Sequence, residues 1–217
     1  MLNKSKGNMY PWVSHTWNVI KGKCPHDCSY CYMKRYPQPE LHFDEKELKT
    51  DLGSGNTIFV GSSCDMWAKG VSENWIIKIL NHCIQYGDGN KYLFQSKNPI
   101  CFIGWSLSVN AMLGTTLETN RSYKVSEAPI PSERAYAIAR QDYPIMVSIE
   151  PIMDFDLDVM LKWMQEIKPE FVSIGANSRP EIKLPEPSGD KVRALIEGLK
   201  EFTEVKIKDN LKRLFKA

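Results

Sequence analysis

Short, wholly apolar runs recur along the chain and alternate with segments of helical periodicity. Uninterrupted apolar runs of this length are typical of parallel strands that are covered on both faces. Strands are therefore predicted at Trp17–Ile20, Thr57–Val60, Tyr92–Phe94, Met112–Leu117, Ile145–Ile149 and Phe171–Ile174.

Between most of these runs, apolar residues recur three and four positions apart, which predicts amphipathic helices. Serine before such a stripe favours a helix start, and glycine or proline after it favours a stop. Helices are predicted from Ser72 to Gly87, from Ser132 through Arg140, over Leu157–Ile167, and from Ser188 to Phe202. Among the connections between predicted strands, residues 98–110 show the least regular helical pattern.

Alternating strands and helices predict an α/β fold with a parallel sheet. Six βα units in 217 residues are fewer than the eight of a closed barrel, which takes about 250 residues. We therefore predict an incomplete (βα)6 TIM-like barrel with parallel strands, forming one domain over residues 1–217. The residues that follow the strands deserve most weight, because parallel sheets carry their chemistry at the carboxyl ends of the strands.

Composition agrees with an ordinary globular protein, since 42% of residues are hydrophobic and 25% are charged. These values exclude a disordered or low-complexity chain. No stretch approaches the ~20 apolar residues that a bilayer span needs, which predicts no membrane association. The first residues hold lysines but no apolar run after them, so we expect no secretory signal and a cytoplasmic location.

The net charge of +2 is spread unevenly. Residues 1–39 carry six basic side chains and one acid, and residues 200–217 carry six basic side chains and three acids. The middle of the chain is consequently net acidic. A basic N-terminal region favours an anionic partner, although solvated surface charge explains it equally well.

Three cysteines, Cys24, Cys28 and Cys31, follow the first strand with the spacing C-x3-C-x2-C. In a reducing compartment such close cysteines are metal ligands more often than disulfides. Thiolates suit zinc or iron–sulfur clusters. A structural zinc site needs a fourth ligand, for which His26 and Cys64 are the candidates. A three-thiolate [4Fe–4S] cluster instead leaves one iron open for chemistry, as in catalytic metal sites.

This motif, with the aromatic Tyr30 just before the last cysteine, resembles the signature of the radical S-adenosylmethionine (radical SAM) superfamily. The resemblance implies a cluster loop at residues 21–36. The charge distribution separately indicates a basic C-terminal tail at residues 204–217. The resemblance also implies that S-adenosylmethionine binds the open iron of a [4Fe–4S] cluster. Reductive cleavage would then release a 5′-deoxyadenosyl radical that abstracts a hydrogen atom from the substrate.

Four further segments resemble a narrower, phage-associated radical SAM family of unknown function. They are Thr16–Val19, Gly114–Asn120, Ser148–Ile152 and Val172–Ser178. The superfamily's Gly-Gly-Glu motif after the second strand is reduced here to Gly61-Ser62-Ser63.

The resemblance and the strand positions together imply a set of cofactor-binding residues. Tyr30 would meet the adenine, and Asp65 would supply the carboxylate that the Gly-Gly-Glu position lacks. The full set is Tyr30, Ser62, Ser63, Asp65, Glu118, Asn120, Ser148 and Glu150. Cys64 lies at the end of the second strand, where its thiol is either a hydrogen donor to a substrate radical or part of the pocket wall.

The sequence therefore favours a radical SAM enzyme without a separate substrate domain. An open-sided barrel suits a macromolecular substrate that closes the site, with a nucleobase in nucleic acid favoured over a protein side chain. A low-potential electron donor such as flavodoxin or ferredoxin would be needed. Two readings outside radical SAM chemistry stay open. One is a zinc-holding nucleic-acid-binding module without catalysis, and the other is an electron-transfer protein, which would require a fourth nearby cysteine.

Overall fold

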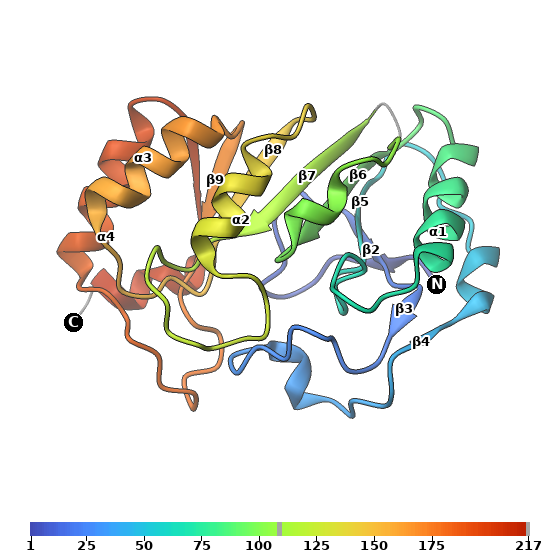
Figure 1. The fold of residues 1–217 in the computed structure, drawn as a ribbon, viewed down its shortest axis with the longest axis horizontal. Helices are drawn as coiled ribbons and strands as arrows, with labels where there is room; N and C mark the ends of the chain where they lie inside the picture. The colour runs from blue at the N-terminus through green and yellow to red at the C-terminus, as the bar shows by residue number, and fades with distance from the viewer. Residues whose placement is uncertain (108–109, 216–217) are drawn as a thin grey trace.

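A computed structural model describes residues 1–107 and 110–215 of the chain (Figure 1). Its main sheet has eight strands in the order β1-β2-β5-β6-β7-β8-β9-β10, and every neighbouring pair from β2 to β10 is parallel. The strands are β1 (Asn3–Lys4), β2 (His15–Trp17), β5 (Thr57–Val60), β6 (Lys91–Ser96), β7 (Ala111–Thr116), β8 (Ile145–Ile149), β9 (Phe171–Ile174) and β10 (Glu204–Ile207). This arrangement confirms the predicted α/β class.

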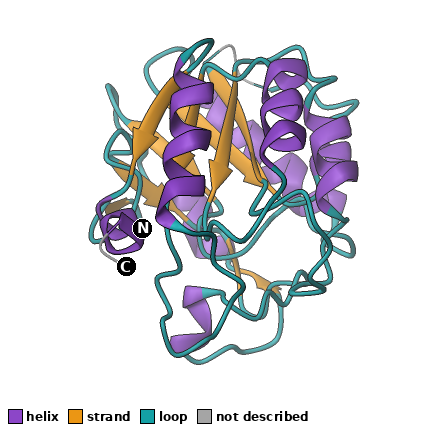
Figure 2. Ribbon diagram, turned by 90° about the vertical axis from the view of Figure 1, so that its left-hand side faces the viewer, coloured by secondary structure: helices purple, strands orange, loops and turns teal. Residues whose placement is uncertain are grey.

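Helices connect successive parallel strands and pack along one side of the sheet (Figures 1 and 2). The α-helices are α1 (Glu73–Gln85), α2 (Pro131–Ile138), α3 (Leu157–Ile167) and α4 (Gly189–Lys200). Short 3-10 helices are η1 (Tyr32–Arg35), η2 (Glu45–Lys49), η3 (Pro99–Phe102) and η4 (Asp209–Phe215). A separate two-stranded sheet pairs β3 (Ile20–Lys21) with β4 (His42–Phe43). None of the helices in the described ranges has the length and apolarity required to cross a bilayer.

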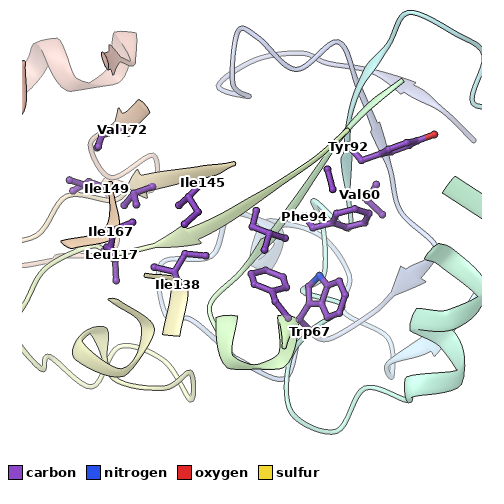
Figure 3. Close-up of a cluster of buried hydrophobic side chains, with 14 of the residues drawn as sticks. Val60, Trp67, Tyr92, Phe94, Leu117, Ile138, Ile145, Ile149, Ile167 and Val172 are labelled. Atoms are coloured by element: carbon purple, nitrogen blue, oxygen red, sulfur yellow. The ribbon is translucent and has the colours of Figure 1, made fainter. Parts of the chain in front are cut away.

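The wholly apolar strands are explained by burial on both faces. On the helix side, alternate strand residues such as Val60, Phe94 and Ile149 join one large core (Figure 3). The intervening residues, including Phe59 and Leu93, face the opposite side of the sheet. Those residues are covered there by the N-terminal segment 8–13, which begins just beyond β1.

Two predicted elements differ from the structure. The run Trp17–Ile20 is not one strand, because the chain leaves the main sheet after Trp17 and pairs Ile20 with Phe43 in the small sheet. This exit carries the chain toward the three cysteines. At the other end, residues 204–207 of the basic tail form a seventh parallel strand, β10, beside β9.

The helices lie close to their predicted bounds. Helix α2 begins at Pro131, one residue before the predicted Ser132, because proline is suited to the first helical position. It ends at Ile138, short of the predicted Arg140. The irregular crossover contains only η3, and residues 108–109 of that segment lie outside the described residues.

Candidate active site

Long loops gather at the carboxyl ends of the parallel strands, below the sheet in Figure 1. The loop that carries the cysteines is joined by backbone hydrogen bonds to the loop after β7. Ser29 N–H donates to the carbonyl of Val125 at 2.8 Å, and Glu127 N–H donates to the carbonyl of His26 at 2.8 Å. The cysteine loop is therefore fixed across the carboxyl edge, where a parallel sheet places its chemistry.

The three cysteines lie near enough for their charges to affect one another. Burial is the main cause that raises the pKa of Cys28, and the charges of Cys31 and Cys24 raise it further. Burial also raises the pKa of Cys31, with Cys24 adding to the effect. By contrast, a hydrogen bond with Cys64 lowers the pKa of Cys24 to about 6. One of the three thiols is thus readily deprotonated for metal binding.

Within residues 1–107 and 110–215, no three His, Cys, Asp or Glu side chains form a group that could hold a metal ion. The donors of the cysteine loop are three thiols whose charges affect one another. Thiolates are the usual ligands of iron–sulfur clusters, so the chemistry of this donor set fits such a cluster. Cys24, Cys28 and Cys31 are the residues that would hold such a cluster.

Asp65 connects the cysteine loop to the ends of β5 and β6. Its Oδ2 is 2.7 Å from His26 Nε2 and accepts hydrogen bonds from Ser96 Oγ at 2.9 Å and Lys97 N at 2.8 Å. Its Oδ1 accepts from Trp67 N at 2.9 Å. Both oxygens are occupied by protein groups, and Asp65 occupies Nε2 of His26, the candidate fourth zinc ligand. This carboxylate therefore braces the cysteine loop.

Glu118 is buried and surrounded by cations. Its carboxylate pairs with Lys97 Nζ and with Arg134 Nη1, which lies 2.8 Å from Oε2. Tyr30 donates its hydroxyl to the same carboxylate. Burial alone would raise the pKa of Glu118, but Arg134 and Lys97 outweigh it and lower the pKa to about 2. Glu118 is therefore an anion that joins the cysteine loop, β6 and α2.

Glu150 occupies the corresponding position after the next strand, β8. Its Oε2 accepts from Lys208 Nζ at 2.8 Å, and its Oε1 accepts from Asn8 at 2.8 Å and Asn210 at 3.2 Å. A Cβ added at Gly175 would lie 2.7 Å from Glu150 Cδ, so glycine leaves room for this side chain beside the end of β9. Glu150 consequently joins both ends of the chain to the sheet.

The other predicted cofactor residues have protein partners as well. Asn18, at the end of β2, accepts from Ser62 Oγ at 3.2 Å and from Ser63 N at 2.9 Å. Asn120 Nδ2 donates to Asp156 at 3.0 Å, beside the start of α3. These contacts position the loops after β5 and β7. Whether the same residues also contact a cofactor stays a prediction.

Ser148 and Tyr10 lie on the side of the sheet that faces away from the helices. Burial raises the pKa of Tyr10, with Glu150 adding to the effect and Ser148 opposing it through a hydrogen bond. Tyr10 Oη donates to Gln95 Oε1 at 2.9 Å, and Gln95 donates to Thr116 Oγ1 at 3.0 Å. A buried polar chain thus runs from the N-terminal segment to β7.

Sequence reasoning missed several residues of this site because their partners are distant in the chain. Arg179, in the loop after β9, donates to the carbonyls of Cys31 at 3.1 Å and Ser29 at 3.5 Å. Arg134 and Lys208 are the cations beside the two carboxylates. Lys97 had a local signal, because it lies three residues after the predicted strand Tyr92–Phe94, in the stretch where chemistry is expected.

The basic side chains of the N-terminal region are largely paired. Lys34 and Lys23 contact Asp27 at 2.6 Å and 3.4 Å. Lys21 pairs with Asp44 at 2.7 Å, and Arg35 lies 3.5 Å from Glu181. The excess of basic residues in the sequence therefore does not become an unpaired basic surface beside the cysteine loop.

No protein-family model and no curated protein matches the chain. Solved structures of spore photoproduct lyase are similar to it. A cysteine-to-serine variant is 10% identical with a TM-score of 0.66, over 93% of this chain and 78% of that one. A double variant with bound AdoMet and dinucleoside spore photoproduct is 11% identical, with a TM-score of 0.53. A complex with the dinucleoside spore photoproduct is 10% identical, with a TM-score of 0.58.

The last two alignments each cover 90% of this chain and 64% of the solved one, so the chain spans under two thirds of those proteins. At this level of identity the likeness shows a shared fold. It supports the predicted partial barrel, and it places an AdoMet-binding protein among the structures with that fold.

Proposed function

We propose that this protein is a radical SAM enzyme that acts on a nucleobase in nucleic acid. One observation carries the proposal. A C-x3-C-x2-C loop is fixed across the carboxyl edge of a fold shared with spore photoproduct lyase, a solved form of which has AdoMet bound. The complex of that enzyme with a dinucleoside lesion favours a nucleic-acid substrate over the protein side chain that the sequence left open.

Cys24, Cys28 and Cys31 would hold a [4Fe–4S] cluster. When bound, the cluster supplies the electron that cleaves S-adenosylmethionine to a 5′-deoxyadenosyl radical, which abstracts a hydrogen atom from the substrate. Asp65 and Arg179 keep the cysteine loop in place through His26 and the carbonyl of Cys31. Such a fixed loop limits reorganisation during the reaction.

The S-adenosylmethionine contacts belong to this proposal. Ser62 and Ser63 are supported by their place after β5, where Asn18 orients them. Tyr30 is supported by its place in the cysteine loop and by its buried ring. Glu118 is engaged by Tyr30, Lys97 and Arg134, which favours an indirect role in positioning Tyr30.

Cys64 is the proposed hydrogen donor. Its thiol is buried, and the neighbouring Cys24 is the main cause that raises its pKa, so it lies beside the cysteine loop. In this role its S–H bond breaks as a C–H bond forms on the substrate radical. The resulting thiyl radical then takes a hydrogen atom from an external thiol, which restores the Cys64 thiol.

The predicted electron donor and cellular location belong to this proposal as well. A flavodoxin or ferredoxin would supply the electron, and the cytoplasm would keep the cysteines reduced. Membership of the phage-associated family also stays a prediction, which rests on the four segments identified in the sequence.

The proposal is tested by anaerobic reconstitution with iron and sulfide, followed by reduction and addition of S-adenosylmethionine. We expect an iron–sulfur chromophore and formation of 5′-deoxyadenosine. Cys28→Ala should lose both, whereas Cys83→Ala, a buried cysteine on α1, should retain both. A colourless protein with tightly bound zinc and intact S-adenosylmethionine would refute the proposal in favour of a binding module.

A further inference from the structure

Two tyrosines are exposed directly after Cys31, the last cysteine of the motif. Tyr32 opens η1 and Tyr36 follows it, and their side chains are 42% and 60% exposed. Exposed apolar groups that lie near one another can mark a binding surface, and these two rings lie beside a candidate active site. In the described part of the chain neither ring is stacked on another aromatic ring.

The segment that presents these rings is held at several points. Tyr32 Oη donates to the carbonyl of Ser62 at 3.1 Å, which ties η1 to the loop after β5. Gln38 Nε2 donates to the carbonyl of Met33 at 2.7 Å and to that of Tyr36 at 3.3 Å. Arg35 donates to the carbonyl of Ser178 at 2.9 Å. The rings are therefore presented by an organised support, which lowers the entropic cost of stacking.

The charges around the rings indicate what kind of contact they make. Lys34 and Arg35 flank the tyrosines, but Lys34 is paired with Asp27 and Arg35 with Glu181. A surface of neutral rings and compensated cations suits the face of a base better than a row of phosphates.

We propose that Tyr32 and Tyr36 form a stacking platform for an unpaired nucleobase of a single-stranded or locally opened nucleic acid. This inference rests on the proposed function, because it names how the substrate strand would be held beside Cys31. An enzyme that reacts with a base must act on one outside the duplex stack, and an aromatic platform stabilises such a base. Ring faces bind every base, so the platform selects unpaired bases with little regard to sequence.

The test measures binding of a fluorescein-labelled single-stranded deoxyoligonucleotide to the reconstituted protein by fluorescence anisotropy. Base stacking on an aromatic ring contributes ~1–3 kcal/mol, so Tyr36→Ala should weaken binding about 5- to 150-fold. Tyr36→Phe should bind as the parent does, because it keeps the ring. Tyr136→Ala is the matched control, since Tyr136 on α2 is also 60% exposed but its ring faces Arg140.

A strand of the same length made of abasic units separates stacking from phosphate contacts. The platform predicts that Tyr36→Ala leaves the affinity for the abasic strand unchanged. It is refuted if Tyr36→Ala binds the normal strand like the parent, loses equal affinity for both strands, or matches Tyr136→Ala. Formation of 5′-deoxyadenosine by the parent without any strand is measured separately. Failure of that reaction rejects the proposed function, and failure of the binding pattern rejects the platform.

Discussion

Glu118 and Glu150 follow adjacent parallel strands, yet they are held by different kinds of neighbours. Glu118 is 1% exposed and contacts two cations and a tyrosine hydroxyl. Glu150 contacts one cation, Lys208, and two amides. A buried carboxylate needs compensation in either setting, but only the first is enclosed by two positive charges.

The difference follows from what each carboxylate connects. Glu118 joins the cysteine loop, through Tyr30, to β6 and α2, so its network supports the candidate cluster site. Glu150 joins the N-terminal Asn8 to Lys208 and Asn210 near the C-terminus, so its network closes the side of the sheet without helices. Glu118 therefore positions the cysteine loop, and Glu150 holds the N-terminal segment 8–13 against the sheet.

Among the substitutions that test this comparison, Glu118→Gln should lower the free energy of unfolding most. Glu118→Gln leaves the buried Arg134 and the partly buried Lys97 without their counter-charge, which costs about 3–5 kcal/mol in the free energy of unfolding. Urea denaturation of the parent and the variant would measure the loss. A variant within about 1 kcal/mol of the parent would show that the two cations find other partners.

Acid should weaken the same network. The pKa of Glu118 is lowered to about 2, below the ~4.3 of an unfolded glutamate, so its contribution is complete above pH ~4.3. That contribution, about 3 kcal/mol, is lost as the pH falls toward 2. The difference in unfolding free energy between the parent and Glu118→Gln should therefore shrink across this window. A difference that is constant from pH 5 to pH 2 would contradict the lowered pKa.

Replacing Glu150 should cost less. Glu150→Gln removes a charge-assisted hydrogen bond to Lys208, worth about 1.5–3 kcal/mol, while Lys208 keeps its bond to the carbonyl of Asn8. Urea denaturation gives the loss, and limited proteolysis reports whether residues 8–13 become more accessible. Equal losses for Glu150→Gln and Glu118→Gln would remove the distinction between the two networks.

The parts of this structure that sequence predicted best are those determined by neighbouring residues. The spacing of Cys24, Cys28 and Cys31 is a local pattern. The strands appear in the sequence as uninterrupted apolar runs, because both of their faces are buried. Helix α4 begins where Ser188 accepts a hydrogen bond from Lys191 N at 3.3 Å, which is a local signal as well.

The parts that escaped prediction depend on contacts between distant residues. Strand β10, with the sequence Glu-Val-Lys-Ile, pairs on one side only, so its mixed polarity is typical of an edge and resembles a charged tail. Residues 8–13 cover the sheet through Tyr10 and Val13, which carry no local pattern of a buried segment. The partners of Glu118 and Glu150 are likewise brought together only by the fold.

The smallest expected effect tests whether the two networks are connected. Tyr10→Phe removes the hydroxyl that donates to Gln95, which should cost about 1 kcal/mol in unfolding free energy. Lys208 Nζ lies 4.9 Å from the centre of the Tyr10 ring, so changes at Tyr10 and Glu150 affect a shared neighbour.

We therefore expect the double variant Tyr10→Phe/Glu150→Gln to depart from additivity by about 0.5 kcal/mol or more, and Tyr10→Phe/Glu118→Gln to add within about 0.5 kcal/mol. The expected additivity of Tyr10→Phe and Glu118→Gln is the stricter test, because a path of hydrogen bonds exists between the two sites. Gln95 donates to Thr116, and Arg134, the partner of Glu118, donates to the carbonyl of Thr116. Coupling between Tyr10 and Glu118 as large as that with Glu150 would mean that the polar chain transmits strain across the sheet. In that case the covering segment and the cysteine loop respond to each other, and Glu118 and Glu150 belong to one network.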